Sequence, residues 1–473
     1  MNASVDEINL IFARQQAVAP DAALTTADQR RAGLERLVTY LQTHLAAAQA
    51  ALHADMRRAP LDTTAELLLV KNEADFAARR LAGWMKPQRV RNSLMSRGTM
   101  AWLQYEPKGV VLIIAPWNAP YACSLVPLVG ALAAGNCAIV KPSEMAPASA
   151  AFLSRMLAEL FPPEQVAVVE GDAATATALL NLPFNHIYFT GNPAVGRLVM
   201  AAAARHLTPV TLELGGKSPT IVDDSAELTT AAYKIGWGKC ANNGQACVAP
   251  DYVLVQANVA QAFVKEVQAA ITAMYNADGQ GIQVSPAYSR IINARHFQRL
   301  QHLLDDALAK GATLAAGGDG VPDDYYLAPT LLTNVTHEMA IMQEEVFGPI
   351  LPILTYDTPE QAVALIHRLP KPLALYIYST HQPTINYFLQ HTSAGSTVIN
   401  HNMIQAGINP HLPFGGVGNS GMGRSVGRAT FESFSNQRSV VRQPTGWRDF
   451  SRLNLPPYSK TYQRLIRFLF GAG

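Results

Sequence analysis

The feature that most constrains the fold of this chain is a regular alternation of short β-branched runs with alanine- and leucine-rich stretches of helical length. The β-branched runs cover residues 110–115, 138–141, 166–169, 187–190 and 210–214, and the stretches between them lie near 121–134, 147–160, 173–181 and 194–206. Apolar strands that alternate with helices are typical of a parallel sheet with helices on both faces. We therefore predict an α/β domain of this kind.

A similar rhythm continues through residues 218–400. Helices are expected near 226–240, 258–275, 290–310 and 359–367, and strands near 252–256, 350–355 and 372–379. A chain of 473 residues is too long for one ordinary core. The second half therefore predicts a second α/β domain, in which the Pro- and Gly-rich stretches 314–323 and 405–424 are connections.

The N-terminal region predicts helices followed by a β element. Thr26 and Gln29 form a capping-box pattern, and leucines at helical spacing follow, so one long helix is expected over 27–56 and a second over 64–85. Alternation of Leu94, Met100 and Trp102 indicates a hairpin near 93–107. That hairpin and a strand near 438–441 would leave sheet edges that need a partner, so we expect a homodimer.

Composition excludes several classes of protein. Hydrophobic residues make up 49% and charged residues 15%, so disorder is not expected, and a mixed net charge of +2 gives no reason for a nucleic-acid partner. The 4 cysteines include no CxxC pair and form no metal-ligand cluster with the 12 histidines. We expect no metal and a reducing compartment. Asp6 and Glu7 precede any apolar run, which argues against a secretory signal and favours the cytoplasm.

Two apolar segments raise the question of a membrane. No charged residue lies between Lys108 and Lys141, but prolines and polar residues interrupt the segment, so we predict a strand, a helix and a strand in place of a membrane span. The basic and apolar tail near 462–470 is shorter than the ~20 residues needed to span. We expect the tail to pack on the protein or on a second subunit, with transient membrane contact as the alternative.

One cysteine and one glutamate stand in glycine-rich, nearly uncharged surroundings. Cys247 ends the run NNGQAC (242–247), and Glu213 begins the run ELGGK (213–217). A thiol in an open polar turn and a carboxylate among apolar residues suggest covalent catalysis, in which the thiolate attacks a carbonyl and the carboxylate activates water. The alternative is an inert buried cysteine and a solvated glutamate.

Two further motifs indicate a dinucleotide. The run TGNPAVG (190–196) follows a predicted strand and opens a helix, whose free N–H groups and dipole attract phosphate. Lys141 and Glu144 follow an earlier strand, where a carboxylate favours a free ribose 2′-hydroxyl. Seen singly, these motifs are equally consistent with a simple turn and a surface ion pair. Together they favour a Rossmann-like cofactor domain.

With these signals in hand, the chain resembles the aldehyde dehydrogenase superfamily from about residue 60 to 445. The motifs appear in family order: PWN (116–118), KPSE (141–144), FTGN (189–192), ELGGK (213–217), GQAC (244–247), EVFGP (345–349) and PFGG (413–416). The runs WMKP (84–87), APDY (249–252) and GNSGMG (418–423) resemble the class-three branch. Within that branch, the chain is most similar to bacterial coniferyl-aldehyde dehydrogenases.

The resemblance implies a role for each matching residue. Cys247 would be the nucleophile, Asn118 with the Cys247 backbone N–H would hold the oxyanion, and Glu213 would activate water. The expected cofactor is NAD, with NADP as a second possibility. Lys141 and Glu144 would hold its adenosine ribose, Gly191 and Gly196 its pyrophosphate, and Glu345 and Phe347 its nicotinamide ribose and ring. Trp117 is also expected at the cofactor, with a role in packing as the alternative. Tyr121, Trp117 and Phe414 are expected to line an apolar path for an aromatic or medium-chain aldehyde.

The resemblance also implies a division of the chain. Residues 1–90 and 108–212 would bind NAD(P), residues 213–424 would form the catalytic domain, residues 91–107 and 425–445 an oligomerisation element, and residues 446–473 a tail. The expected activity is oxidation of an aldehyde to an acid. A cofactor-independent thiol hydrolase and a catalytically silent binding protein are the alternatives. The intact Cys247, Glu213, Asn118 and Glu345 argue against the silent protein.

Overall fold

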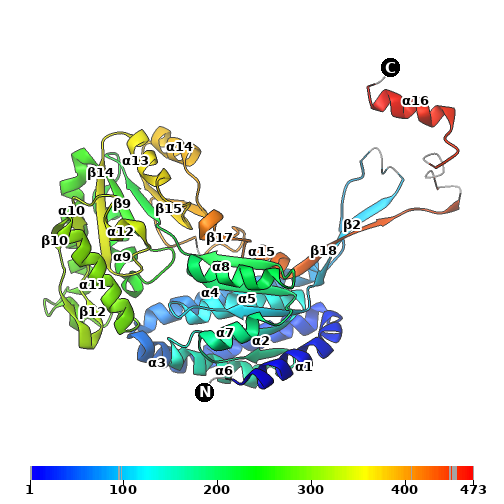
Figure 1. The fold of residues 1–473 in the computed structure, drawn as a ribbon, viewed down its shortest axis with the longest axis horizontal. Helices are drawn as coiled ribbons and strands as arrows, with labels where there is room; N and C mark the ends of the chain where they lie inside the picture. The colour runs from blue at the N-terminus through cyan, green and yellow to red at the C-terminus, as the bar shows by residue number, and fades with distance from the viewer. Residues whose placement is uncertain are drawn as a thin grey trace.

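The structure is a computed structural model that describes residues 3–93, 96, 98–405, 407–446, 449 and 455–471. Its first sheet has the strand order β17-β7-β6-β3-β4-β5, and all of its pairings are parallel except that of β17 with β7. The strands are β3 (Val110–Ile114), β4 (Cys137–Lys141), β5 (Val166–Val168), β6 (His186–Gly191), β7 (Val210–Leu214) and β17 (Gly421–Met422). The predicted parallel sheet is confirmed (Figure 1).

Helices cover both faces of this sheet because its strands are apolar on both sides. Val111 and Ile113 of β3 belong to the core that packs on α5, whereas Leu112 belongs to the core that includes Ile8 and Phe12 of α1. The helices of this domain are α1 (Val5–Ala23), α2 (Ala27–Thr43), α3 (Leu45–Met56), α4 (Pro60–Trp84), α5 (Pro120–Ala134), α6 (Pro147–Leu160), α7 (Ala173–Leu180) and α8 (Pro193–Ala204).

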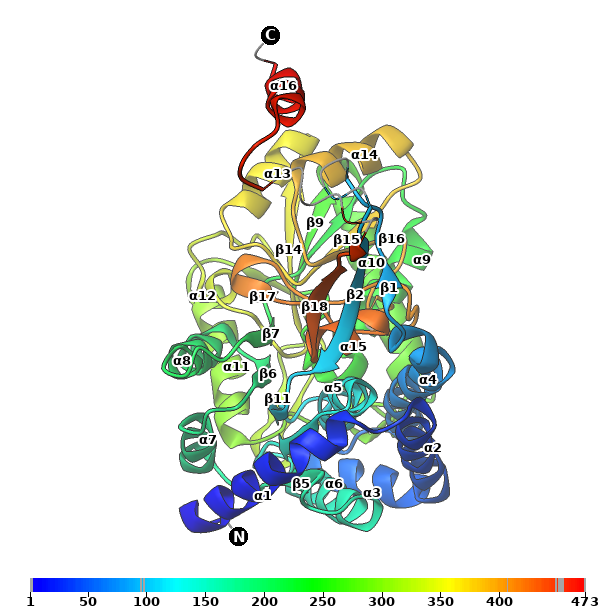
Figure 2. The same cartoon turned by 90° about the vertical axis from the view of Figure 1, so that its right-hand side faces the viewer.

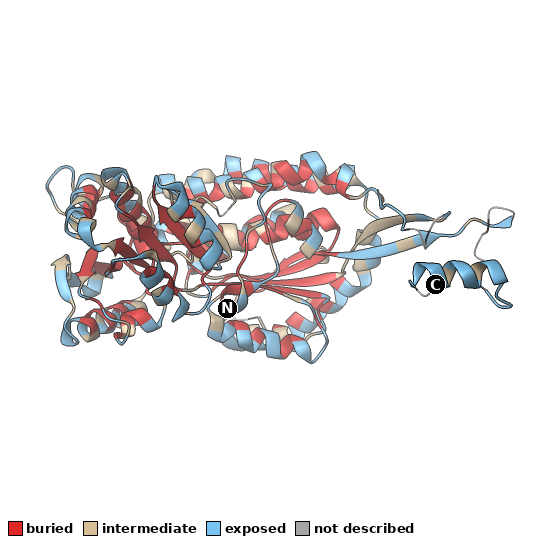
Figure 3. Cartoon of the chain, turned by 90° about the horizontal axis from the view of Figure 1, so that it is seen from above, coloured by how far each residue is buried: buried red, intermediate tan, exposed pale blue. Residues whose placement is uncertain are grey.

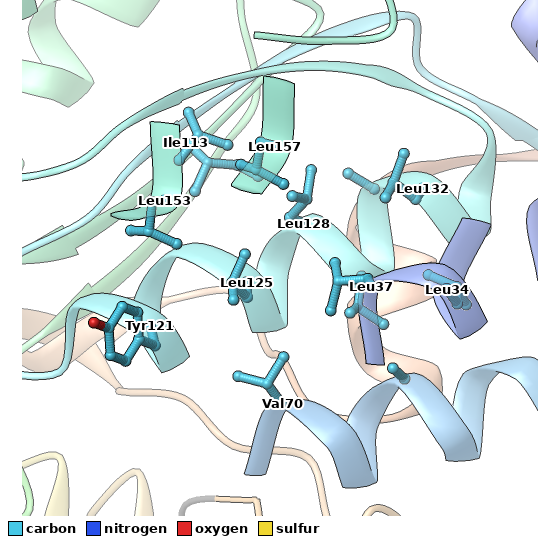
Figure 4. Close-up of a cluster of buried hydrophobic side chains, with 14 of the residues drawn as sticks. Leu34, Leu37, Val70, Ile113, Tyr121, Leu125, Leu128, Leu132, Leu153 and Leu157 are labelled. Carbon is cyan, nitrogen blue, oxygen red and sulfur yellow. The ribbon is translucent and has the colours of Figure 1, made fainter. Parts of the chain in front are cut away.

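Helix α5 lies at the centre of the larger of these two cores. Figure 4 shows Leu125, Leu128 and Leu132 of α5 among side chains from α2, α4, α6 and β3. The charge-free segment of the sequence is thus a strand, a helix and a strand (β3, α5 and β4), as predicted. Within the described ranges, no helix combines the length and the apolar character that crossing a membrane requires.

The second sheet has the order β10-β13-β14-β9-β8-β15-β16 and is parallel apart from the pairing of β10 with β13. Its strands are β8 (Pro219–Val222), β9 (Tyr252–Gln256), β10 (Thr313–Ala316), β13 (Thr330–Thr333), β14 (Ile350–Tyr356), β15 (Ala374–Tyr378) and β16 (Ser396–Ile399). The surrounding helices are α9 (Leu228–Cys240), α10 (Ala260–Tyr275), α11 (Ala294–Ala309), α12 (Ala340–Gln343), α13 (Pro359–His367) and α14 (Gln382–His391). The second α/β unit is therefore present as predicted (Figure 2).

A long two-stranded arm leaves the body and leads to the tail. Strand β2 (Met100–Pro107) pairs along its whole length with β18 (Ser435–Arg442), and its other edge meets β1 (Gln88–Arg89). Helix α15 (Arg428–Ser433) precedes the arm, and helix α16 (Lys460–Leu469) lies beyond its end, away from both sheets (Figure 1). Figure 3 shows the outer arm and α16 as largely exposed, in contrast to the buried sheets.

Several expectations need correction. The long helix expected over 27–56 is broken at His44, where the backbone leaves the helical region (φ −110°, ψ 22°). The side chains of Thr43 and His44 both bond to the carbonyl of Tyr40, which competes with continuation of the helix. The stretch expected as a hairpin supplies one long strand that pairs with distant β18, and Leu94 lies outside the described residues.

Some short elements were not anticipated. The stretches expected to be connections contain most of β10, together with β17 and β11 (Gly320–Val321), and β11 pairs with β12 (Tyr326–Leu327) just beyond the first stretch. Strands β8, β13 and β16 and helix α14 were also missed, as was α1, although Ser4 and Glu7 form a capping box at its start. Short strands with few alternating residues give a weak periodic signal.

Candidate active site

A tight turn at the end of α9 places Cys247. The backbone of Asn242, Asn243 and Gly244 is left-handed, with φ of 49°, 54° and 68°. A Cβ atom at Gly244 would stand 2.4 Å from the carbonyl oxygen of Gly348, so only glycine fits there. Asparagine is among the few other residues that tolerate this conformation, which explains the run of residue types that precedes the thiol.

The side chain of Gln245 fixes the same turn from inside. Its Nε2 donates to the carbonyl of Arg290 at 2.9 Å, and its Oε1 accepts from the backbone N–H of Ile292 at 3.1 Å. Just after the thiol, the hydroxyl of Tyr376 donates to the carbonyl of Val248. The segment with Cys247 is therefore held on both sides by fully buried groups.

Cys247 is partly exposed and packs with Phe414 against the apolar core of the second sheet. The pKa of the thiol is raised to about 12, mainly by burial and in smaller part by the charges of Glu345 and Glu213. Its own backbone N–H and that of Val248 oppose the rise. The thiol is thus protonated at neutral pH. It needs a proton acceptor before it can act as a nucleophile.

Asn118, between β3 and α5, contacts the turn of residues 242–247, which carries the proposed nucleophile and is called the nucleophile turn below. Its Nδ2 donates to the carbonyl of Gln245 at 3.0 Å, and its own carbonyl accepts from the Nδ2 of Asn242 at 3.0 Å. The guanidinium of Arg58 donates to the same carbonyl at 3.2 Å and pairs with buried Glu66 at 2.6 Å. These bonds tie Asn118 to the turn that carries Cys247, and its role as an oxyanion donor stays a prediction.

Glu66 also holds the helix that follows Asn118. Its Oε1 accepts from the backbone N–H groups of Tyr121 and Ala122 at 2.8 and 2.9 Å, so a carboxylate of α4 caps the start of α5. Burial raises the pKa of Glu66, and Arg58 and the two N–H donors oppose that rise. The position of the Asn118 amide is thereby tied to α4.

Glu213 lies in β7 with 5% of its surface exposed. Its Oε1 accepts from the hydroxyl of Ser425 at 3.3 Å, whereas its Oε2 is buried without a protein partner. Burial raises the pKa of Glu213 to about 8, against the effects of Ser425 and Arg424. A buried carboxylate oxygen with no donor requires a water or a reacting group beside it.

Lys141 and Glu144 lie together at the carboxyl end of β4. The Nζ of Lys141 donates to the carbonyl of Pro142 at 3.0 Å and to Oε2 of Glu144 at 3.3 Å. Lys141 is buried, whereas the side chain of Glu144 is 46% exposed. The glutamate therefore remains free to accept hydrogen bonds from a ligand.

Gly191 and Gly196 flank the start of α8, and both pack inward. A Cβ atom at Gly196 would stand 2.8 Å from Leu214, and one at Gly191 would stand 2.5 Å from the ring of Phe189. Gly196 thus allows α8 to pack closely on β7, whereas the contact at Gly191 lies within β6. Contact of their backbone with a pyrophosphate stays a prediction. Asn192 caps the helix by accepting from the N–H of Val195 at 2.9 Å.

Glu345 and Phe347 lie on a segment that an ion pair anchors. Lys217 pairs with Asp251, both nearly fully buried, and Lys217 also donates to the carbonyl of Glu344 at 2.9 Å. Burial, together with the charge of Asp251, raises the pKa of Glu345 to about 8. A Cβ atom at Gly215 would collide with Oε2 of Glu345, so this glycine makes room for the carboxylate.

An aromatic group adjoins this segment. The ring of Trp117 meets Phe347 edge-on at 5.4 Å and His296 at 5.3 Å. Phe347 has a left-handed backbone (φ 46°), and the Nε2 of His296 is buried without a partner. Asn293, at the start of α11, reaches Met145 beside Glu144. The start of α11 thus contacts both the segment of Glu144, where the adenosine ribose is expected, and Trp117, which lies beside the expected nicotinamide site.

The interpretation of one residue was wrong. Tyr121 is fully buried, donates to the carbonyl of Ala48 at 2.8 Å and packs against Phe152, so it belongs to the core of the first domain and lines no path for substrate (Figure 4). Cys123, in the first turn of α5, is partly exposed; burial of its thiol raises its pKa, and the charges of Cys247, Glu66 and Glu213 add to that effect.

Four residues at the site escaped the sequence analysis, namely Asp251, Ser425, His296 and Arg58. Asp251 could have been found, because it lies in the motif APDY (249–252) and its partner Lys217 lies in ELGGK (213–217). No local pattern marks the other residues. Within the described ranges, no cluster of three or more His, Cys, Asp or Glu side chains is arranged to hold a metal ion.

Comparison with known proteins decides which family this site belongs to. The model of the aldehyde dehydrogenase family matches residues 1–440. The chain belongs to the aldehyde dehydrogenase family. Aldehyde dehydrogenase family 3 member B2 of Mus musculus is 40% identical over 94% of this chain and 91% of its own length. The "Probable coniferyl aldehyde dehydrogenase" of Pseudomonas aeruginosa is 40% identical over 98% and 97%.

A solved structure agrees with the whole fold. The substrate-bound state of AldH from Staphylococcus aureus covers 99% of this chain and 100% of its own, with a TM-score of 0.93 and 38% identity. The chain is accordingly an NAD(P)-dependent aldehyde dehydrogenase, which oxidises small-molecule aldehydes to acids. The resemblance to the family and to its class-three branch is confirmed.

Proposed function

We propose that Cys247 is the nucleophile of this aldehyde dehydrogenase, that Glu213 is its general base and that Asn118 is its oxyanion donor. The observation that supports this most is the Oε2 of Glu213, which is buried without a protein partner beside the nucleophile turn. An unpaired oxygen on a carboxyl with a pKa of about 8 is suited to accept a proton from water near neutral pH.

The residues act in order. Cys247 gives its proton to solvent water and attacks the aldehyde carbon, while the Nδ2 of Asn118 and the Cys247 backbone N–H stabilise the oxyanion of the thiohemiacetal. One such donor is typically worth about 3 kcal/mol of barrier. Oxidation of that carbon leaves a thioester on Cys247. Glu213 then takes a proton from water, which attacks the thioester and releases the acid.

The proposed cofactor residues fit a nicotinamide dinucleotide. Lys141 and the exposed carboxylate of Glu144 would hold the adenosine ribose, the start of α8 at Gly191 and Gly196 the pyrophosphate, and Glu345, Phe347 and Trp117 the nicotinamide half. The buried, unpaired Nε2 of His296 beside Trp117 marks a place for a polar ligand group. When bound, the cofactor supplies the oxidation by accepting a hydride from the substrate carbon.

The proposed substrate is an aromatic or medium-chain aldehyde, with coniferyl aldehyde as one candidate. Phe414, which is half-buried and packs on the same core as Cys247, supports an apolar approach to the thiol. The relative from Pseudomonas aeruginosa, named as a coniferyl aldehyde dehydrogenase, matches nearly the whole chain and points to the same class. Relative kcat/KM values for coniferyl, benzaldehyde-like, straight-chain and short aldehydes would rank these substrates.

A trapping experiment tests the two chemical roles. Glu213→Gln keeps the shape of the side chain but accepts no proton, so we expect about one turnover and then a stable thioester. Intact-mass spectrometry after addition of aldehyde and oxidised cofactor should show one acyl group on the protein. Cys247→Ala should show neither the adduct nor cofactor reduction, and its melting temperature should be unchanged. Aldehyde-dependent reduction by Cys247→Ala would contradict the proposal.

We also propose a homodimer in which the arm of β2 and β18 contacts the partner. In the described part of the chain β18 is an edge strand, whose unpaired backbone groups favour addition of another strand. Helix α16 leaves Leu465 and Phe468 exposed, which supports packing of the tail on the partner, and transient membrane contact is the alternative. The domain limits given above remain part of this proposal.

A further inference from the structure

The hydroxyl of Ser425 is the one protein group within hydrogen-bonding distance of the Glu213 carboxylate among the described side chains. It stands 3.3 Å from Oε1 and 3.4 Å from the carbonyl of Phe414, and Ser425 is 3% exposed. A hydroxyl gives its one hydrogen to the stronger acceptor, which is the carboxylate when Glu213 is ionised. The carbonyl provides a second acceptor when Glu213 is protonated.

The backbone fixes Ser425 independently of its side chain. Its N–H donates to the carbonyl of Phe414 at 2.7 Å, and its own carbonyl accepts from the N–H of Phe414 at 2.8 Å. A change of the side chain at Ser425 therefore leaves the local main-chain bonds in place.

The next residues carry backbone strain. Val426 has a φ of 75°, which is a true outlier for a β-branched residue. Gly427 follows with a φ of 61°, and its N–H donates to both oxygens of buried Glu73 at 2.8 Å. The hydroxyl of Thr430 also donates to Glu73. Strain of this kind persists only where surrounding bonds enforce it, and it is common at functional sites. Here the bonds to Glu73 hold the backbone that directly follows Ser425.

The other titratable groups that face Glu213 come from three further places. Burial raises the pKa of Tyr188 on β6, of Cys123 on α5 and of Cys247, so all three are neutral at pH 7. Arg424, next to Ser425, favours the ionised carboxylate by its charge. Its guanidinium, however, is engaged with the carbonyls of Gly416 and Gly423. Among the described groups, only Ser425 contacts the carboxylate directly.

We propose that Ser425 is the positioning residue of the general base. Its hydroxyl holds Oε1 of Glu213 and so leaves Oε2 turned toward the water that attacks the thioester. The hydroxyl acts on release of the acyl group and has no part in its formation, because it touches neither Cys247 nor Asn118 in the structure. This inference rests on the role of Glu213 given under the proposed function.

Hydrolysis of p-nitrophenyl acetate by the full-length enzyme without cofactor separates the two steps. The burst reports acylation of Cys247, and the steady phase reports the water step. For Ser425→Ala we expect an unchanged burst and a steady phase about tenfold slower at pH 7, because a lost bond to the charged carboxylate raises the pKa of Glu213 by about one unit. In a plot of the steady-phase rate against pH, the rise that reports ionisation of Glu213 should therefore move about one pH unit higher.

Two variants serve as controls. Ser425→Thr keeps the hydroxyl and should restore the rate and the pH profile. Ser433→Ala removes a hydroxyl that binds the carbonyl of Arg424 at 2.6 Å, so it loosens the same segment without touching Glu213 and should leave the profile in place. An unshifted profile in folded Ser425→Ala, or an equal shift in Ser433→Ala, would overturn the inference. Wild-type deacylation by Glu213→Gln would instead overturn the proposed base.

Discussion

Lys141 and Glu144 are the residues proposed to hold the adenosine ribose of a bound dinucleotide. The carboxylate of Glu144 is half exposed, and one of its oxygens is engaged by Lys141 at 3.3 Å. A carboxylate accepts hydrogen bonds from free ribose hydroxyls and repels a 2′-phosphate, whereas the lysine offsets part of that repulsion. NAD should therefore be preferred, with NADP still used.

Substitution of Glu144 tests this balance. In Glu144→Gln the repulsion is removed and Lys141 remains, so the ratio of kcat/KM for NADP over NAD should rise by about tenfold, which corresponds to roughly 1.4 kcal/mol. Steady-state kinetics with both cofactors at a fixed aldehyde concentration provides the measurement. A strong preference for NADP in the unmodified enzyme would mean that Glu144 does not face the ribose.

At the residue scale, motifs could predict the groups proposed to react but not those that hold them. Cys247, Glu213 and Asn118 lie in short runs whose chemistry is visible in the sequence. Ser425 and Arg58 reach the site through contacts between distant segments, which no local pattern encodes. Tyr121 was misjudged because proximity to Asn118 in sequence does not reveal that the first turn of α5 directs its ring into the core.

At the scale of elements, the buried pair of Lys217 and Asp251 fixes a loop to a strand. Asp251 precedes β9, and its Oδ1 accepts from the N–H of Val346 at 2.9 Å, between Glu345 and Phe347. Loss of one member of a buried pair leaves the other charge unpaired, which typically costs 3–5 kcal/mol. The loop that is proposed to hold the nicotinamide half would then lose its anchor.

We expect Asp251→Asn to weaken cofactor binding more than acylation. The dissociation constant for NADH, measured by fluorescence titration, should rise at least tenfold, while the cofactor-free burst with p-nitrophenyl acetate should persist because the Gln245 bonds of the nucleophile turn remain. The surface pair of Arg428 and Glu432 offers a control, since Glu432→Gln should change neither quantity. Unchanged NADH affinity in a folded Asp251→Asn protein would contradict the anchoring role.

The succession of elements could be predicted where strands are apolar throughout and helices are long. Strands β3, β4, β6 and β7 and the helices between them lie close to their expected positions. The break at His44 could not be predicted, because it depends on side chains that compete for one backbone carbonyl. Short strands such as β8 and β16 gain stability from neighbours in the sheet, not from their own pattern.

At the scale of the whole molecule, the arm and α16 carry exposed apolar residues that a second subunit would cover. We expect light scattering at micromolar concentration to give a mass about twice the 51.0 kDa of the chain. Val441 on β18 is 64% exposed, so Val441→Asp should weaken the dimer without unfolding the subunit. Leu207→Asp, at an even more exposed apolar residue in the turn before β7, is the matched control. A monomeric unmodified protein would exclude this assembly.

Helix α4 makes no hydrogen bond to Cys247 or Glu213 in the described part of the chain, yet it sets the spacing between two parts of the proposed site. Glu66 caps the segment of Asn118, and Glu73 clamps the turn after Ser425. The two carboxylates are seven residues apart, so they project from one face of the helix about 10 Å from each other. A single inserted residue between them would rotate one carboxylate by about 100°. The number of residues between Glu66 and Glu73 therefore fixes the distance between the segment of Asn118 and the segment of Ser425, so an insertion or deletion in α4 would disturb the site without changing any residue in it.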